Sequence, residues 1–169
     1  MIGAVIVGLL VLSAIGSLLW TLPSKADRQR AAMRTEAMQS GLSVMTLSVP
    51  DTTDRGRIDD KRRLITLYKK RSAEPAAFQP FTLVRTEGEH GYGLPEGWVW
   101  EPPSHRLRGA ALEQLLMCLQ ALPDWIDVLS VQSDGLAVSF NERQGAHQVG
   151  EVREFLETQL PVFFPAQSR

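Results

Sequence analysis

The first 22 residues of the chain, MIGAVIVGLLVLSAIGSLLWTL, contain no charged side chain. As a helix, about 21 of them would rise about 31 Å, which matches the roughly 30 Å hydrocarbon core of a bilayer. A cleaved secretory signal is the alternative, and the small-x-small sequence at residues 24–26 favours it. However, no basic residue precedes Ile2, and the apolar run exceeds the usual signal core of about 7 to 15 residues. The stretch therefore predicts a transmembrane anchor over residues 1–22.

The residues that flank this stretch predict its orientation. Its C-terminal side carries a cluster of basic residues, whereas only the α-amine lies on its N-terminal side. The cluster consists of Lys25, Arg28, Arg30 and Arg34. By the positive-inside rule, the N-terminus lies outside and residues 23–169 lie in the cytoplasm, so the chain is predicted to be a single-pass membrane protein. Small residues spaced four apart, Ala4 with Gly8 and Ser13 with Ser17, would allow weak homo-oligomerisation through the span.

Charge is distributed unevenly along the chain, although its net charge is only −1. Residues 24–71 contain twelve Lys or Arg and six Asp or Glu, whereas residues 72–169 contain six and thirteen. Anionic lipid attracts a basic segment and repels an acidic one, so this distribution predicts a domain that projects from a membrane surface. The single cysteine, Cys118, cannot form an internal disulfide, which fits a reducing cytoplasm. Its apolar neighbours indicate a structural thiol rather than a nucleophile.

The first half of the chain after the anchor predicts a helix followed by strands. Residues 23–41 are rich in helix-forming residues and end at a glycine, and their polar character on all sides indicates a basic juxtamembrane helix that forms a stalk. Three strand-like runs follow at residues 42–49, 62–70 and 81–86, and an antiparallel meander is their simplest assembly. The polar residues 51–61 between the first two runs predict an exposed loop. Together with the Gly- and Pro-rich segment that follows, they predict a β-rich subdomain over residues 42–103.

The second half predicts a helix–hairpin–helix subdomain over residues 104–169. Leucines from Leu112 to Leu122 follow helical spacing up to Pro123. Two strand-like runs, 126–132 and 136–141, flank an Asp-Gly pair that is a strong hairpin signal. A last helix is expected to end at Pro161. Together these elements predict an α+β fold in which a transmembrane helix and a stalk helix carry a small mixed domain.

No arrangement of residues typical of an enzyme or a metal site occurs in the sequence. The three histidines are far apart in the chain, and none has a second ligand at helical spacing. Neither a phosphate-binding glycine loop nor a nucleophile elbow is present. We therefore expect no catalytic residue, no bound cofactor and no metal site.

Two groups of residues are candidates for contact with other molecules. The first is a set of basic residues for anionic lipid: Lys25, Arg28, Arg30, Arg34, Lys61, Arg62, Arg63, Lys69, Lys70 and Arg71. The alternative is that they are solvated strand ends, partly neutralised by nearby aspartates. The second is the pair Trp98 and Trp100, which would form a partner surface if exposed and fill the core if buried. Exposed aromatics between the basic residues are scarce, which disfavours a nucleic-acid partner.

The N-terminal layout resembles the YajC family, small single-span accessory subunits of the bacterial preprotein translocase. The resemblance rests on an apolar span that ends at Pro23, the basic residues after it and a Met-containing polar helix up to Gly41. It covers about the first 45 residues, and the strand opening of that family is replaced here by Gly41-Leu42-Ser43-Val44. The whole chain also resembles uncharacterised single-span inner-membrane proteins of proteobacteria. These resemblances imply a location in the bacterial inner membrane.

Three functions follow as hypotheses from these observations. The first is a membrane-anchored adaptor that binds a protein partner at the cytoplasmic face without catalysis. The second is an accessory subunit of the preprotein translocase, as the YajC resemblance implies. The third is a membrane-tethered enzyme of a type that these motifs do not reveal. The lack of a catalytic arrangement favours the adaptor.

Overall fold

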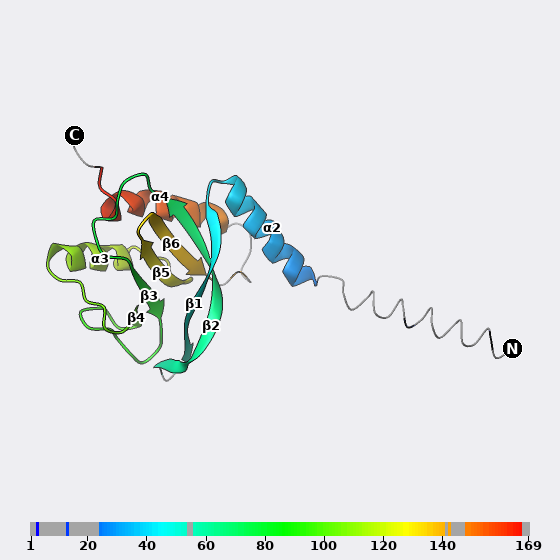
Figure 1. The fold of residues 1–169 in the computed structure, drawn as a ribbon, viewed down its shortest axis with the longest axis horizontal. Helices are drawn as coiled ribbons and strands as arrows, with labels where there is room; N and C mark the ends of the chain where they lie inside the picture. Colours follow the sequence, from blue (N-terminus) through cyan, green and yellow to red (C-terminus); the bar gives the residue numbers. More distant parts are fainter. Residues whose placement is uncertain are drawn as a thin grey trace.

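The computed structural model describes residues 24–53, 56–140, 142 and 148–166, together with Gly3 and Ser13, and only the backbone of residues 53 and 56–60. The elements are arranged as Figure 1 shows. In chain order they are α2 (Lys25–Gln39), β1 (Ser43–Thr53), β2 (Gly56–Arg71), β3 (Phe81–Arg85), β4 (Trp98–Glu101), α3 (Ala110–Gln120), β5 (Ile126–Gln132), β6 (Gly135–Phe140) and α4 (Gln148–Phe163).

All six strands belong to one antiparallel sheet with the order β1-β2-β6-β5-β3-β4. β1 and β2 form a long hairpin that extends away from the helices (Figure 1). The β5–β6 hairpin lies between β2 and β3, so strands from residues 42–103 and from residues 104–169 share the sheet. The division into two subdomains at residue 103 stays a prediction.

Alternate side chains of a strand point to opposite faces of the sheet. In this sheet both faces carry buried side chains. One face packs against the helices through a large cluster that includes Tyr68, Leu129 and Phe163. On the other face, each strand contributes one buried side chain to a second cluster, namely Val49, Leu67, Val84, Val99, Val128 and Ala137. All of these are strand residues, so the sheet must curve to cover its own inner face. The sheet is therefore a half-barrel, and a contact at 3.1 Å joins Arg62 of β2, the strand next to the β1 edge, to Glu101 of β4 at the other edge.

The predicted architecture, a three-strand meander followed by a helix–hairpin–helix, is wrong. The β2–β3 pairing of the predicted meander does not occur, because β2 pairs with β6 and β3 pairs with β5. Within residues 51–61, expected to form an exposed loop, residues 51–53 instead belong to β1 and residues 56–61 to β2. The last helix continues past Pro161 to Phe163, whose side chain is fully buried and holds the final turn on the core. The β5–β6 hairpin is confirmed, but Gln132 pairs with Gly135, so the turn consists of Ser133 and Asp134 and the glycine belongs to β6.

The membrane-anchored architecture also requires correction. None of the helices in the described ranges combines the length and the apolar character needed to cross a bilayer. The predicted span over residues 1–22 lies outside the described residues, apart from Gly3 and Ser13. The structure thus gives no support to the predicted single-pass protein of the inner membrane with a cytoplasmic domain.

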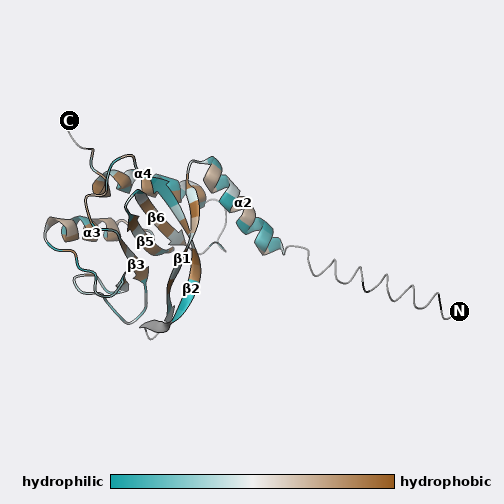
Figure 2. Ribbon diagram, in the orientation of Figure 1, coloured by the Kyte–Doolittle hydropathy of each residue, from teal (hydrophilic) through white to brown (hydrophobic). Residues whose placement is uncertain are grey.

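The predicted stalk helix exists but is docked on the domain. α2 begins with a capping box in which Ser24 accepts a hydrogen bond from the Asp27 amide and Asp27 bonds back to Ser24. Most of the helix is hydrophilic, as Figure 2 shows. Met33 and Ala37, however, are fully buried in the cluster beneath the helices. These two side chains fix one face of α2 against the rest of the protein.

Candidate functional site

A polar cleft of about 410 Å³ lies between α2 and strands β2, β5 and β6. We call it the arginine cleft, because three arginines are among its lining residues. Its lining residues are Arg30, Arg34, Arg63, Leu64, Ile65, Thr66, Asp127, Ser139, Phe140 and Glu142. Arg30 and Arg34 project from successive turns of one face of α2, since residues four apart are neighbours on a helix. Arg63 comes from β2, so arginines of two elements line the cleft.

The cleft exists because two neighbouring strands separate. β2 pairs with β6 only over Tyr68–Arg71, although β2 begins at Gly56. If the register of Tyr68 with Val138 continued, Leu67 would face Ser139 and Thr66 would face Phe140. Instead, Thr66, Ser139 and Phe140 line the cleft. The cleft is therefore a gap in the ladder between β2 and β6.

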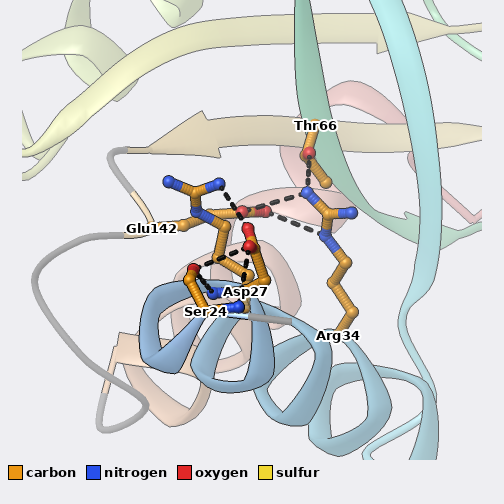
Figure 3. A network of polar contacts seen from close by, with 6 residues as sticks. Ser24, Asp27, Arg34, Thr66 and Glu142 are labelled. Atoms are coloured by element: carbon orange, nitrogen blue, oxygen red, sulfur yellow. Dashed lines mark hydrogen bonds and ion pairs between the residues drawn. The ribbon is translucent and has the colours of Figure 1, made fainter. Parts of the chain in front are cut away.

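A network of hydrogen bonds joins α2 to the sheet at one end of this gap (Figure 3). The Arg34 guanidinium donates to both carboxylate oxygens of Glu142, at 3.0 and 3.3 Å, and to Thr66 Oγ1 at 2.9 Å. The Tyr68 hydroxyl donates to Glu142 Oε1 at 2.9 Å. The hydrogen-bonded Glu142 carboxylate raises the pKa of Arg34, and burial followed by the bond to Glu142 raises the pKa of Tyr68. Arg34 is therefore firmly charged and fixed in position.

Arg30 lies one turn before Arg34 and is held more loosely. Its guanidinium contacts Asp27 Oδ1 at 3.3 Å, and Asp27 is also part of the capping box of α2. Both side chains of this pair are well exposed. An exposed ion pair of this kind contributes little to stability, so Arg30 is available to a ligand at small cost.

Asp127 lies in the same cleft and carries the opposite charge. It is the extra residue of a β-bulge, because Ile126 pairs with Phe140 and Val128 pairs with the adjacent Ser139. A bulge redirects a side chain from the regular alternation of a strand, and bulges are frequent beside functional sites. Burial raises the pKa of the Asp127 carboxyl, while Arg63 and Arg85 oppose that shift. The cleft thus contains a half-buried carboxyl that takes up a proton more readily than an ordinary aspartate.

Most of the ten basic residues predicted to contact lipid are distributed over separate ion pairs. Two of the pairs share Asp51, which contacts Lys61 at 3.0 Å and Arg63 at 4.0 Å. The other pairs are Arg30–Asp27, Arg34–Glu142, Arg62–Glu101, Lys69–Asp134 and Lys70–Glu157. Lys25 and Arg28 are exposed on α2, and Arg71 is exposed at the end of β2. The cleft brings together only Arg30, Arg34 and Arg63 of this set.

The two tryptophans occupy the core rather than a partner surface. Trp98 and Trp100 are 5% and 1% exposed, so the core alternative is the one observed. Trp100 Nε1 donates to the Tyr92 carbonyl at 3.0 Å. Cys118 is also buried, and burial raises its pKa to about 12. At neutral pH this thiol is protonated, which is the state expected of a structural cysteine.

Asp127 and Glu142 were missed by the sequence interpretation. Asp127 is a single acid at the second position of an apolar strand, and such a break in the pattern is a sequence signal of a bulge. Glu142 has no comparable signal, because it follows the last strand in a polar segment. Within the described part of the chain, no group of His, Cys, Asp and Glu side chains has the geometry to hold a metal ion.

No protein-family model and no curated protein matches this chain. Among solved structures, the chain is similar to the crystal structure of the mycobacterial trehalose monomycolate transport factor A, TtfA. The two share 12% sequence identity with a TM-score of 0.41, and the match covers 86% of this chain and 100% of that chain. A likeness of this strength assigns neither a family nor a function. None of these comparisons bears on the resemblance to YajC.

Proposed function

We propose that this chain is a binding module without catalytic activity, which recognises an acidic segment of a protein partner in the arginine cleft. The observation that supports it is that three arginines, from α2 and β2, line one open cleft. Arginine is the residue of choice for carboxylate recognition, because its planar group offers five N–H donors in a fixed geometry.

The cleft retains capacity to bind a carboxylate. The Arg63 guanidinium is 4.0 Å from Asp51, which is too far for a hydrogen bond. Arg34 is held by Glu142 and Thr66, but it has further N–H groups that can donate. A carboxylate that reaches Arg34 or Arg63 would therefore gain charge-assisted hydrogen bonds without breaking the existing network.

The charges in the cleft also favour a short acidic segment over a polyanion. Asp127 and Glu142 place two carboxyl groups beside the three arginines. A nucleic acid carries a dense row of phosphates and would meet these carboxyls repeatedly. A protein segment can place a single acidic side chain against Arg63 and leave Asp127 facing a neutral group.

Arg63→Gln is expected to weaken binding of a short fluorescein-labelled peptide of alternating Glu and Val residues by about 10-fold, because a hydrogen bond to a charged group contributes about 1.5–3 kcal/mol. The measurement is fluorescence anisotropy at low salt. Lys70→Gln is the matched control, since it removes the same charge from the same strand, outside the cleft, where Lys70 pairs with Glu157 at 2.9 Å. We expect its affinity to stay within about 2-fold of the wild type. Equal losses in both variants, or no binding to the wild type, would contradict the proposal.

The affinity is also expected to depend on pH through Asp127. The pKa of Asp127 lies above its ordinary value of 3.8 because of burial, and an acidic ligand would raise it further. Lowering the pH from 7 toward that pKa protonates Asp127, removes a repulsive charge and strengthens binding. The rise reverses once the carboxyls of the probe are protonated, near their ordinary pKa of about 4.3.

Asp127→Asn tests this dependence with the same peptide. The variant is expected to bind more tightly than the wild type at pH 7 and to lose the rising part of the pH profile. Anisotropy titrations at a series of pH values measure both effects. A rising profile that persists in Asp127→Asn would show that another group is responsible.

A further inference from the structure

Along the arginine cleft, one edge of β2 has no strand partner in the part of the chain that the structure describes. β1 pairs with β2 from Gly56 to Ile58 and, after a bulge, from Arg62 to Lys69. On the other side, the pairing with β6 covers only Tyr68–Arg71. Over residues 63–67 this second edge therefore has no strand partner among the described residues, and four consecutive residues of it, 63–66, line the cleft.

Backbone N–H and C=O groups are obligatory hydrogen-bonding groups, and an open strand edge presents a row of them. Leu64 lies on this segment and is 76% exposed, one of the few large apolar side chains on the described surface. Thr66 contributes its hydroxyl to Arg34, but that bond uses the side chain and leaves the backbone of Thr66 unaffected. The segment thus combines an open edge, an apolar side chain and flanking arginines.

We infer that the acidic partner segment binds as an extended strand added to β2 along residues 63–67. The inference rests on the proposed function and specifies how the same cleft is used. Five residues of strand span about 17 Å, so a segment of that length would suffice. Backbone hydrogen bonds would supply affinity, and side chains that alternate along the segment would supply specificity.

Charge complementarity identifies the occupant of this edge. Arg30 and Arg34 come from α2 on one side of the gap, and Arg63 comes from β2 itself. By the alternation of β2, Thr66 lies on the face next to α2, whereas Arg63 lies on the opposite face together with Leu67. In an added strand, acidic residues at alternate positions would therefore meet the arginines of α2 on one face or Arg63 on the other. A partner with an acidic, extended segment therefore fits, whereas a basic segment would meet three like charges.

Two N-methylated forms of the Glu-Val peptide test this inference. In one form the odd-numbered amides are methylated, and in the other the even-numbered amides, so each form blocks hydrogen bonding along one edge of the peptide. An added strand uses one edge only. We expect one form to bind at least about 10-fold more weakly than the unmethylated peptide, and the other to bind within about 2-fold of it.

Amide hydrogen exchange measured by NMR is the second readout. Binding of the unmethylated peptide should slow exchange at alternate amides among residues 63–67. Equal affinities of the two methylated forms, or unchanged exchange in this segment, would overturn the strand inference and leave the proposed function standing if Arg63→Gln still weakens binding.

Two other outcomes would also count against the inference. Protection of residues 63–67 without peptide, together with a dimer in analytical ultracentrifugation, would show that a second copy of this chain occupies the edge. No binding of the unmethylated peptide would overturn the proposed function and the strand inference together.

Discussion

Trp100→Ala is expected to lower the free energy of unfolding by about 3–5 kcal/mol, the usual cost of removing a large aromatic side chain from a core. The indole is 1% exposed and packs edge-on against Phe81, with ring centroids 5.5 Å apart. It also lies 5.0 Å from the His105 ring. The variant would leave a cavity beneath β4 and would remove the hydrogen bond from Nε1 to the Tyr92 carbonyl.

Urea denaturation followed by circular dichroism measures this loss. Met117→Ala is the control, because Met117 is 62% exposed on α3 and its truncation should change the free energy by no more than about 0.5 kcal/mol. A loss below about 1 kcal/mol for Trp100→Ala would mean that Trp100 is exposed in solution, and would restore it as a candidate partner surface.

Gly135→Ala is expected to destabilise the protein by about 3 kcal/mol, at the upper end of the usual cost of overpacking. Gly135 begins β6 and faces Arg71 of β2. A Cβ at this position would lie 2.2 Å from the Lys70 carbonyl oxygen and 3.0 Å from the Arg71 Cα. Both are backbone atoms, so relief requires β2 and β6 to separate in their short paired region.

Gly150→Ala is the matched control for Gly135→Ala. Gly150 lies in α4, and a Cβ there would meet no atom within 4 Å. Since alanine favours a helix over glycine by about 0.5–1 kcal/mol, this variant should be neutral or more stable. Thermal and urea unfolding compare the two variants. Equal stabilities would contradict the close pairing of β2 with β6 that bounds the arginine cleft.

Local elements of the fold could be predicted from the sequence, whereas their assembly could not. The β5–β6 hairpin follows from Asp134-Gly135, and α3 follows from leucines at helical spacing, because both signals act over a few residues. The position of that hairpin between β2 and β3 depends on contacts across the whole chain. A meander was expected because consecutive strands usually pair, and here the connection after β2 is long enough to let another hairpin enter.

For the candidate site, too, the individual residues could be recognised from the sequence, whereas their assembly could not. Arg30, Arg34 and Arg63 were recognised as basic residues, but nothing in their spacing distinguished them from the other seven candidates. Their convergence depends on the docking of α2 through Met33 and Ala37, a polar helix that was expected to stand apart from the domain. Asp127 lies in the cleft because of a β-bulge. In the sequence, this bulge is visible only as a polar residue within an apolar run.

The measurement that tests the central claim most directly is photocrosslinking of the Glu-Val peptide with a diazirine group at its centre, followed by mass spectrometry. The account predicts crosslinks on residues 30–34 of α2 and residues 63–66 of β2, and their loss in Arg63→Gln. Crosslinks spread over the other basic residues, such as Lys69–Arg71 at the opposite end of β2, would contradict it.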